Sequence, residues 1–198
     1  DLPQDTLLTG TGGRYEYSNK GIDLFLDSLA LLNSDTTQSR QVAAFLFVPA
    51  WNDGPDRELV AKMESGSSYT TITTHKLREP EHDPILKKLR ELGLNNSPDS
   101  RVKLFFVPTY LNGSDGVVNL EYYKLLSGLD ISVFPSFYEP WGYTPLESLA
   151  FGVPTITTTL AGFGMWVKDH FSGNRNGIAI VERDEFSYNE TVQRVKDK

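Results

Sequence analysis

The sequence predicts an α/β fold with a doubly wound, mostly parallel, Rossmann-like sheet, in a single domain spanning residues 1–198. Two observations support this prediction. Apolar runs of strand length alternate with helical stripes about six times along the chain, as in successive βαβ units. Residues 41–48 form a near-continuous apolar run, which is typical of a strand buried on both faces of a parallel sheet.

The N-terminal segment predicts the first βα unit. Residues 6–9 are expected to form a strand and residues 10–13 a glycine loop. Apolar side chains then recur at helical spacing over residues 21–32. The glycine loop is therefore expected to join a strand end to a helix start, where nucleotides commonly bind.

Residues 51–74 give a weaker pattern and are expected to be an excursion from the core. A turn is predicted at residues 53–56 and a short helix at residues 57–64. His75 and His82 have no partner at metal-ligand spacing, so both are expected to be structural or solvated.

The remaining elements follow from capping residues, proline and glycine. They are a helix over 83–92, a strand over 102–107, a loop over 111–118, a helix capped by Asn119 that runs to Leu126, a strand over 131–134, a helix from Thr144 to Gly152, a strand over 155–158, a glycine turn over 161–164, a helix towards His170, a loop over 172–174, a strand over 177–181, and a last helix whose capping box is Ser187 and Glu190.

Composition excludes several classes of function. The chain has 198 residues and a formal net charge of −7, which argues against nucleic acid or an anionic membrane as the main partner. It has no cysteine, so it forms no disulfide and no thiolate metal site. No apolar run is long enough to span a membrane, and a soluble, cytoplasmic protein is expected.

The most informative stretch is residues 134–154, which combines a strand end, a loop and a helix start. Backbone N–H groups around Gly142, Tyr143 and Thr144 are expected to point out from the helix start and to bind phosphate. Glu139 and Glu147 bracket this turn. A capped helix start without a ligand is the alternative, because such starts are common.

Arg14 and Lys20 flank the loop into the first helix. A G-x-G-x-x-G motif would need glycine at Tyr15, and a P-loop would need Lys before Ser or Thr, whereas Lys20 precedes Gly21. Two cations beside a helix start nevertheless suit a diphosphate. The alternative is a pair of solvated surface cations.

Tyr122 and Tyr123 are adjacent on a predicted helix and therefore face different directions. One can pack in the core while the other faces a cleft. Simple packing of both rings is the alternative.

Several segments, taken together, resemble the C-terminal half of animal and fungal-type glycogen synthases, and a bacterial member of that family is expected. The likeness covers nearly the whole chain in order. The matching segments are residues 14–21, Thr73-Thr74-His75, residues 82–86, residues 101–103, the run Tyr138-Glu139-Pro140-Trp141-Gly142-Tyr143-Thr144-Pro145 with Glu147, and Gly162-Phe163-Gly164.

The resemblance implies half of a two-domain GT-B fold, with a nucleotide-sugar held in the cleft between domains. It implies that Arg14 and Lys20 hold the donor diphosphate and that Glu139 contacts the sugar, which makes these three the expected catalytic residues. It further implies that Tyr122 stacks on the base, that the turn at Gly142, Tyr143 and Thr144 binds phosphate, and that Glu147 reaches the ribose.

The implied activity is retaining transfer of glucose from UDP-glucose or ADP-glucose to an α-1,4-glucan, without a metal or other cofactor. The sequence contains no Asp-x-Asp pair, as expected for metal-free transfer. Two alternatives stay open: a GT-B transferase of the sucrose or trehalose synthase type, and a non-catalytic nucleotide- or glycan-binding module.

The sequence departs from the family pattern in two respects. The segment between residues 51 and 68 is too short for the family's long helical insertion, so the oligomeric state is left open. The acceptor domain is not in this chain. Because the chain starts at Asp1 and its last helix looks cut short, we expect a piece of a longer polypeptide that is inactive alone.

Overall fold

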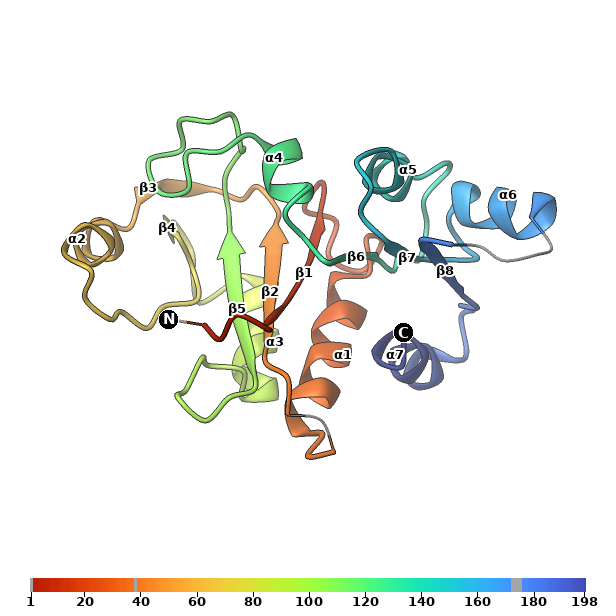
Figure 1. Cartoon of the computed structure of the whole chain (residues 1–198), viewed down its shortest axis with the longest axis horizontal. Coiled ribbons are helices and arrows are strands. Elements are labelled where there is room, and N and C mark those ends of the chain that lie inside the picture. The colour runs from red at the N-terminus through yellow and green to blue at the C-terminus, as the bar shows by residue number, and fades with distance from the viewer. Residues whose placement is uncertain (1, 38, 172–175) are drawn as a thin grey trace.

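A computed structural model describes residues 2–37, 39–171 and 176–198. Its main sheet has six strands in the order β5-β2-β1-β6-β7-β8, and each neighbouring pair is parallel. The prediction of a doubly wound, mostly parallel α/β fold is therefore confirmed. The strands in Figure 1 are β1 (Leu7–Gly12), β2 (Val42–Phe47), β5 (Val102–Val107), β6 (Ile131–Phe134), β7 (Thr155–Thr158) and β8 (Ile178–Val181).

The strand order creates a topological switch point between β1 and β6. From β1 the sheet extends outward through β2 to β5, and the other half is built from β6 through β7 to β8. The connections after β1 and β6 therefore leave the same edge of the sheet and diverge. Ligands of open parallel sheets bind in the crevice that such a divergence leaves.

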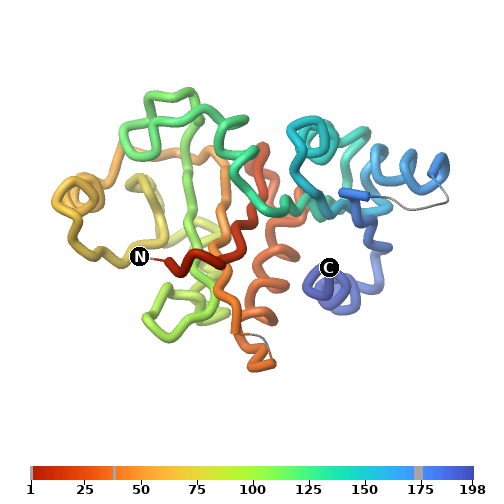
Figure 2. Tube along the Cα trace, in the orientation of Figure 1, coloured from red at the N-terminus to blue at the C-terminus, as the bar shows by residue number. Residues whose placement is uncertain are grey.

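Helices cover both faces of the sheet. They are α1 (Ile22–Ser34), α3 (Pro84–Leu92), α4 (Tyr122–Leu126), α5 (Tyr143–Ala150), α6 (Gly162–His170) and α7 (Tyr188–Lys196). α1, α3 and α7 bury apolar side chains in one core with the strands. α4, α5 and α6 lie on the opposite side (Figure 1). α1 and α7 come from distant parts of the chain but pack side by side (Figure 2).

A two-stranded antiparallel sheet lies at the edge of the molecule beside β5 (Figure 1), and the segment that leads into it bonds to β5, with the Thr74 N–H donating to the Phe106 carbonyl at 3.0 Å. It consists of β3 (Asn52–Pro55) and β4 (His75–Leu77), with α2 (Arg57–Ser65) between them. The predicted short helix is confirmed. The turn predicted at residues 53–56 is wrong, because residues 52–55 pair with β4 instead. His75 is buried, and its ring contacts the Thr74 hydroxyl at 2.9 Å, as expected for a structural histidine.

Two predicted glycine loops belong to regular elements instead. β1 continues through Gly10 and Gly12, because these residues stay in register with β2 as far as Phe47. Gly162 and Gly164 lie in the first turn of α6. The loop predicted at residues 172–174 falls outside the described residues.

One predicted helix cap, Asn119, is wrong, and another, Ser187, lies at its predicted position without the predicted hydrogen bonds. Asn119 adopts a left-handed φ of 53° and accepts a hydrogen bond from the Gly116 N–H at 2.8 Å, so it closes the preceding loop. α4 begins later, at Tyr122. Ser187 stands at the start of α7 but makes no capping hydrogen bond there. Glu190 pairs with Arg194 at 3.1 Å, one turn further along the helix.

Within the described part of the chain, no helix combines the length and apolar character needed to cross a membrane.

Candidate functional site

An ion pair between Lys20 and Glu139 lies at the switch point of the sheet. Lys20 is in the loop after β1, and Glu139 is in the loop after β6. Their side chains are only 16% and 18% exposed. A charge pair this far from water interacts more strongly than a surface pair. The structure thus brings together two predicted site residues that are far apart in the sequence.

Backbone contacts hold the two loops against each other. The Asn19 carbonyl accepts hydrogen bonds from the N–H groups of Phe137, at 2.8 Å, and Tyr138, at 3.3 Å. Gly21 has a left-handed φ of 67°, and a Cβ there would lie 2.0 Å from the Pro135 carbonyl oxygen. Only glycine therefore permits this approach, which brings Lys20 to Glu139.

Gly142 begins α5 in a left-handed conformation with a φ of 96°. Thr144 was predicted as the cap, but it is the second residue of the helix and makes no capping hydrogen bond. The first N–H groups of any helix lack an intrahelical partner, and no side chain caps those of α5. Such a helix start can receive an anion, as expected for the turn at Gly142, Tyr143 and Thr144.

The start of α6 is hydrogen-bonded to the same loop. The Gly162 N–H donates to the Glu139 carbonyl at 3.0 Å, and the Phe163 N–H donates to the Trp141 carbonyl at 2.6 Å. A Cβ on Gly162 would meet the Pro140 carbonyl oxygen at 2.2 Å. The loop that carries Glu139 is therefore fixed on both sides, by the loop after β1 and by α6.

Arg14 does not join the Lys20–Glu139 pair. Its side chain is 79% exposed and pairs with Glu16 at 2.9 Å. An exposed pair of this kind is weak, so the guanidinium can leave Glu16 for a ligand at little cost. Arg14 lines a cavity of about 530 Å³ that also includes Tyr122 and Thr144.

Tyr122 presents its ring to this cavity and packs edge-on against Phe47, with centroids 6.2 Å apart. Its hydroxyl is buried and has no hydrogen-bond partner among the described residues. Burial, helped by the Glu147 charge, raises the pKa of Tyr122 well above its ordinary value, so the phenol stays protonated. A buried hydroxyl without a partner is uncommon in a folded protein.

Glu147 accepts a hydrogen bond from the Tyr123 hydroxyl at 3.1 Å. This bond and the Glu147 charge raise the pKa of Tyr123. The Tyr123 ring stacks on Phe151 at 4.8 Å, while Tyr122 faces the cavity. The expectation that the two tyrosines face different directions is confirmed. The Glu147 carboxylate is thus held by Tyr123, a neighbour that sequence reasoning did not assign to it.

Sequence reasoning also missed Arg183, which follows β8 and is buried. Its guanidinium donates to the Pro135 carbonyl, at the beginning of the loop that carries Glu139. The available signal was an arginine two residues after the apolar strand Ile178–Val181, where a charged side chain is close enough to the sheet to be buried with a specific partner.

The comparison with known proteins decides the family. Residues 1–54 and 56–198 match the family model for glycogen synthase. The chain belongs to the glycogen synthase family. It is 31% identical over 252 aligned positions to glycogen [starch] synthase from Neurospora crassa, covering 98% of this chain and 36% of that protein. It is 32% identical to the liver glycogen [starch] synthase of Homo sapiens, covering 91% of this chain and 33% of that protein.

This member of the glycogen synthase family spans about a third of the length of these relatives. The Neurospora alignment is longer than the 198-residue chain, so that relative contains segments that this chain lacks. The fold also matches part of WaaG, a glycosyltransferase involved in lipopolysaccharide biosynthesis, with a TM-score of 0.53 at 17% identity. That match covers 99% of this chain and 38% of WaaG, and it supports the GT-B assignment of the fold alone.

Proposed function

We propose that this chain is the donor-nucleotide domain of a retaining glucosyltransferase that extends an α-1,4-glucan from UDP-glucose or ADP-glucose. The single observation that carries the proposal is the Lys20–Glu139 ion pair at the switch point of a glycogen synthase family sheet. Its two charges suit the two parts of the donor. Lys20 suits the diphosphate, and Glu139 suits the sugar that becomes positively charged during transfer.

The proposed reaction breaks the bond between C1 of the donor glucose and the diphosphate oxygen, whose electron pair stays with the diphosphate. The terminal 4-hydroxyl of the glucan forms the new bond to C1 on the same face, and its proton passes to the departing diphosphate. Negative charge therefore grows on the diphosphate. The N–H groups at Gly142, Tyr143 and Thr144 stabilise it, together with Lys20 and Arg14 once these two side chains turn to the diphosphate.

In this proposal, donor binding opens the Lys20–Glu139 pair. Lys20 turns to the diphosphate, because the two phosphate groups together carry about two negative charges, whereas the Glu139 carboxylate carries one. Glu139 is then available to the glucose ring. Without a ligand, each residue neutralises the other, so neither charge is buried without compensation.

The cavity beside Tyr122 suits the base, and Glu147 suits the ribose hydroxyls. Ring stacking on Tyr122 tolerates both uracil and adenine, since every base has an apolar face. Comparing the affinities of UDP and ADP decides which nucleotide the family member uses. This chain spans about a third of the relatives' length. We propose that the acceptor surface lies in the remainder, so this chain alone is expected to transfer little glucose.

The proposal is tested by Glu139→Gln in a polypeptide of full family length that carries this chain. We expect glucan extension to fall at least about 100-fold, while UDP or ADP affinity is kept, because Glu139 acts on the sugar and not on the diphosphate. Glu182→Gln is the matched control, since Glu182 is exposed and pairs with Lys168. Normal turnover in Glu139→Gln would contradict the proposal and favour a non-catalytic binding module.

A further inference from the structure

Arg183 is a buried cation to which the proposed reaction assigns no role. Arg183 is 7% exposed, and its Cζ atom lies 5.2 Å from the centre of the Phe137 ring. Its guanidinium also donates to the Pro135 carbonyl. Burial lowers the pKa of Arg183, and the Asp23 charge opposes this shift. A guanidinium held against a carbonyl and a ring is well placed to fix backbone geometry.

Both contacts fall on the segment that carries Glu139. Pro135 is the first residue after β6, and Phe137 lies two residues before Glu139. The Phe137 N–H donates in turn to the Asn19 carbonyl, next to Lys20. Arg183 therefore contacts the loop after β6 at two points, and that loop is bonded to the loop after β1.

We propose that Arg183 is a positioning residue for the donor site, which sets the path of residues 135–139 and hence the placement of Glu139 against Lys20. This inference rests on the proposed function for its effect on catalysis. Its structural part, the placement of the loop, stands on the contacts alone.

The site requires arginine in particular. A Cβ on Gly21 would lie 2.0 Å from the Pro135 oxygen and 2.9 Å from Nη1 of Arg183, so the carbonyl and the guanidinium occupy the same tight space beside this glycine. A planar guanidinium can donate to the carbonyl and stack on Phe137 at once. A lysine ammonium keeps the charge but has no plane to stack.

Arg183→Lys separates positioning from charge. In the full-length polypeptide, we expect kcat to fall about 100-fold with a smaller change in the donor KM, because a displacement of about 1 Å costs that much at a catalytic group. In the 198-residue chain, we expect the amide resonances of Phe137 and Glu139 to shift without any ligand.

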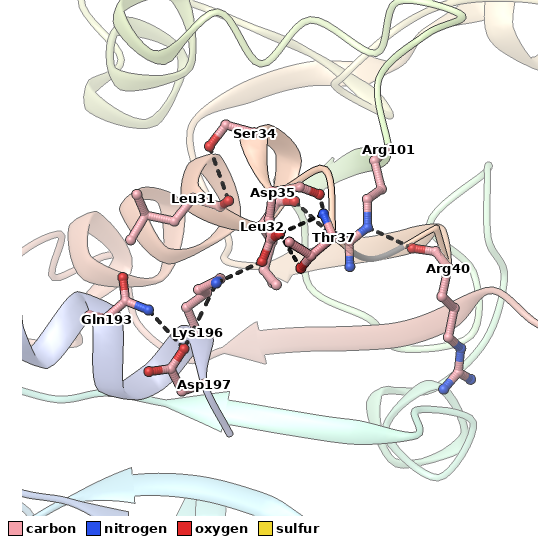
Figure 3. Close-up of polar contacts among 10 residues, drawn as sticks. All are labelled: Leu31, Leu32, Ser34, Asp35, Thr37, Arg40, Arg101, Gln193, Lys196 and Asp197. Carbon is pink, nitrogen blue, oxygen red and sulfur yellow. Dashed lines mark hydrogen bonds and ion pairs between the residues drawn. The ribbon is translucent and has the colours of Figure 1, made fainter.

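Arg101→Lys is the matched control, because Arg101 also donates hydrogen bonds to backbone carbonyls, but at the opposite end of the sheet. It donates to the carbonyls of Arg40 at 2.8 Å, Leu32 at 2.8 Å and Asp35 at 3.1 Å (Figure 3). We expect this variant to lose stability but to keep kcat and the Glu139 resonance.

Three results would overturn the inference. The first is unchanged Phe137 and Glu139 resonances in Arg183→Lys. The second is full kcat in that variant, and the third is an equal loss of kcat in Arg101→Lys, which would indicate general destabilisation. If Arg183→Lys does not fold, Phe137→Leu removes the stacked ring and should shift the Glu139 resonance. If the unmodified polypeptide transfers no glucose, the proposed function fails, but the resonances still decide the role of Arg183.

Discussion

Lys20 and Glu139 show how a single pair of residues connects fold and chemistry. Neither residue alone identifies a site, because isolated lysines and glutamates are usually solvated surface groups. The structure places them together with less than a fifth of either side chain exposed. Breaking such a pair leaves one charge without its partner, which costs more than the loss of a surface ion pair.

Lys20→Met is predicted to weaken UDP or ADP binding about tenfold to 100-fold, since a hydrogen bond to a charged group contributes about 1.5–3 kcal/mol. Isothermal titration of the chain measures this change. Lys168→Met serves as control, because Lys168 pairs with Glu182 at 2.6 Å on the exposed surface of α6. Equal affinities for the Lys20 variant and the unmodified chain would show that Lys20 does not contact the nucleotide.

At the scale of elements, the sequence predicted most strands and helices from their apolar patterns. The strand over residues 102–107 and the helix over residues 83–92 were predicted closely, because buried runs and caps such as Asp83 are local signals. The helix starts at Gly142 and Gly162 were missed. Gly162 is required because a Cβ there would lie 2.2 Å from the Pro140 carbonyl oxygen, and Gly142 is favoured by its left-handed φ of 96°; no local pattern reveals either requirement.

Gly21→Ala is predicted to destabilise the chain by about 3 kcal/mol or more, because a Cβ cannot fit against the Pro135 carbonyl. Gly152→Ala is the matched control: it has a similar left-handed φ of 77°, but a Cβ there meets nothing within 4 Å. Its cost is about 1–2 kcal/mol from backbone conformation alone. Urea unfolding measures both changes, and equal costs would contradict the close approach of the two loops.

The end of α1 is tied to the end of α7 by Asp35 and Lys196, which lie 2.7 Å apart (Figure 3). Hydrogen bonds from Lys196 and Thr37 hold the pKa of Asp35 well below its usual range. A lowered folded-state pKa stabilises the chain above the unfolded pKa of about 3.9, and this contribution is lost as the pH falls through the lowered pKa.

Asp35→Asn is therefore predicted to lower the thermal midpoint at pH 7, with a difference from the unmodified chain that shrinks progressively below about pH 4. Thermal unfolding followed by circular dichroism across this pH range measures the effect. Asp197→Asn is the control, because Asp197 is exposed and lies 3.9 Å from Lys196. A difference that grows on acidification would contradict the assigned pKa direction.

At the scale of the whole molecule, the strand order brings the loops after β1 and β6 together, although more than a hundred residues separate Lys20 from Glu139. Sequence patterns predicted a parallel sheet and thus a shared edge for these loops. They could not predict that Lys20 pairs with Glu139 while Arg14 turns outward to Glu16. Those orientations depend on packing between loops, and on Arg183, which no motif marked.

The central claim, a donor nucleotide site at the switch point, is tested most directly by NMR titration of the 198-residue chain with UDP and UDP-glucose. We predict saturable shifts at Arg14, Lys20 and Tyr143 with both ligands, and a larger shift at Glu139 with UDP-glucose than with UDP. The absence of shifts at these residues at millimolar UDP and ADP, or shifts confined to the opposite end of the sheet, would contradict the claim.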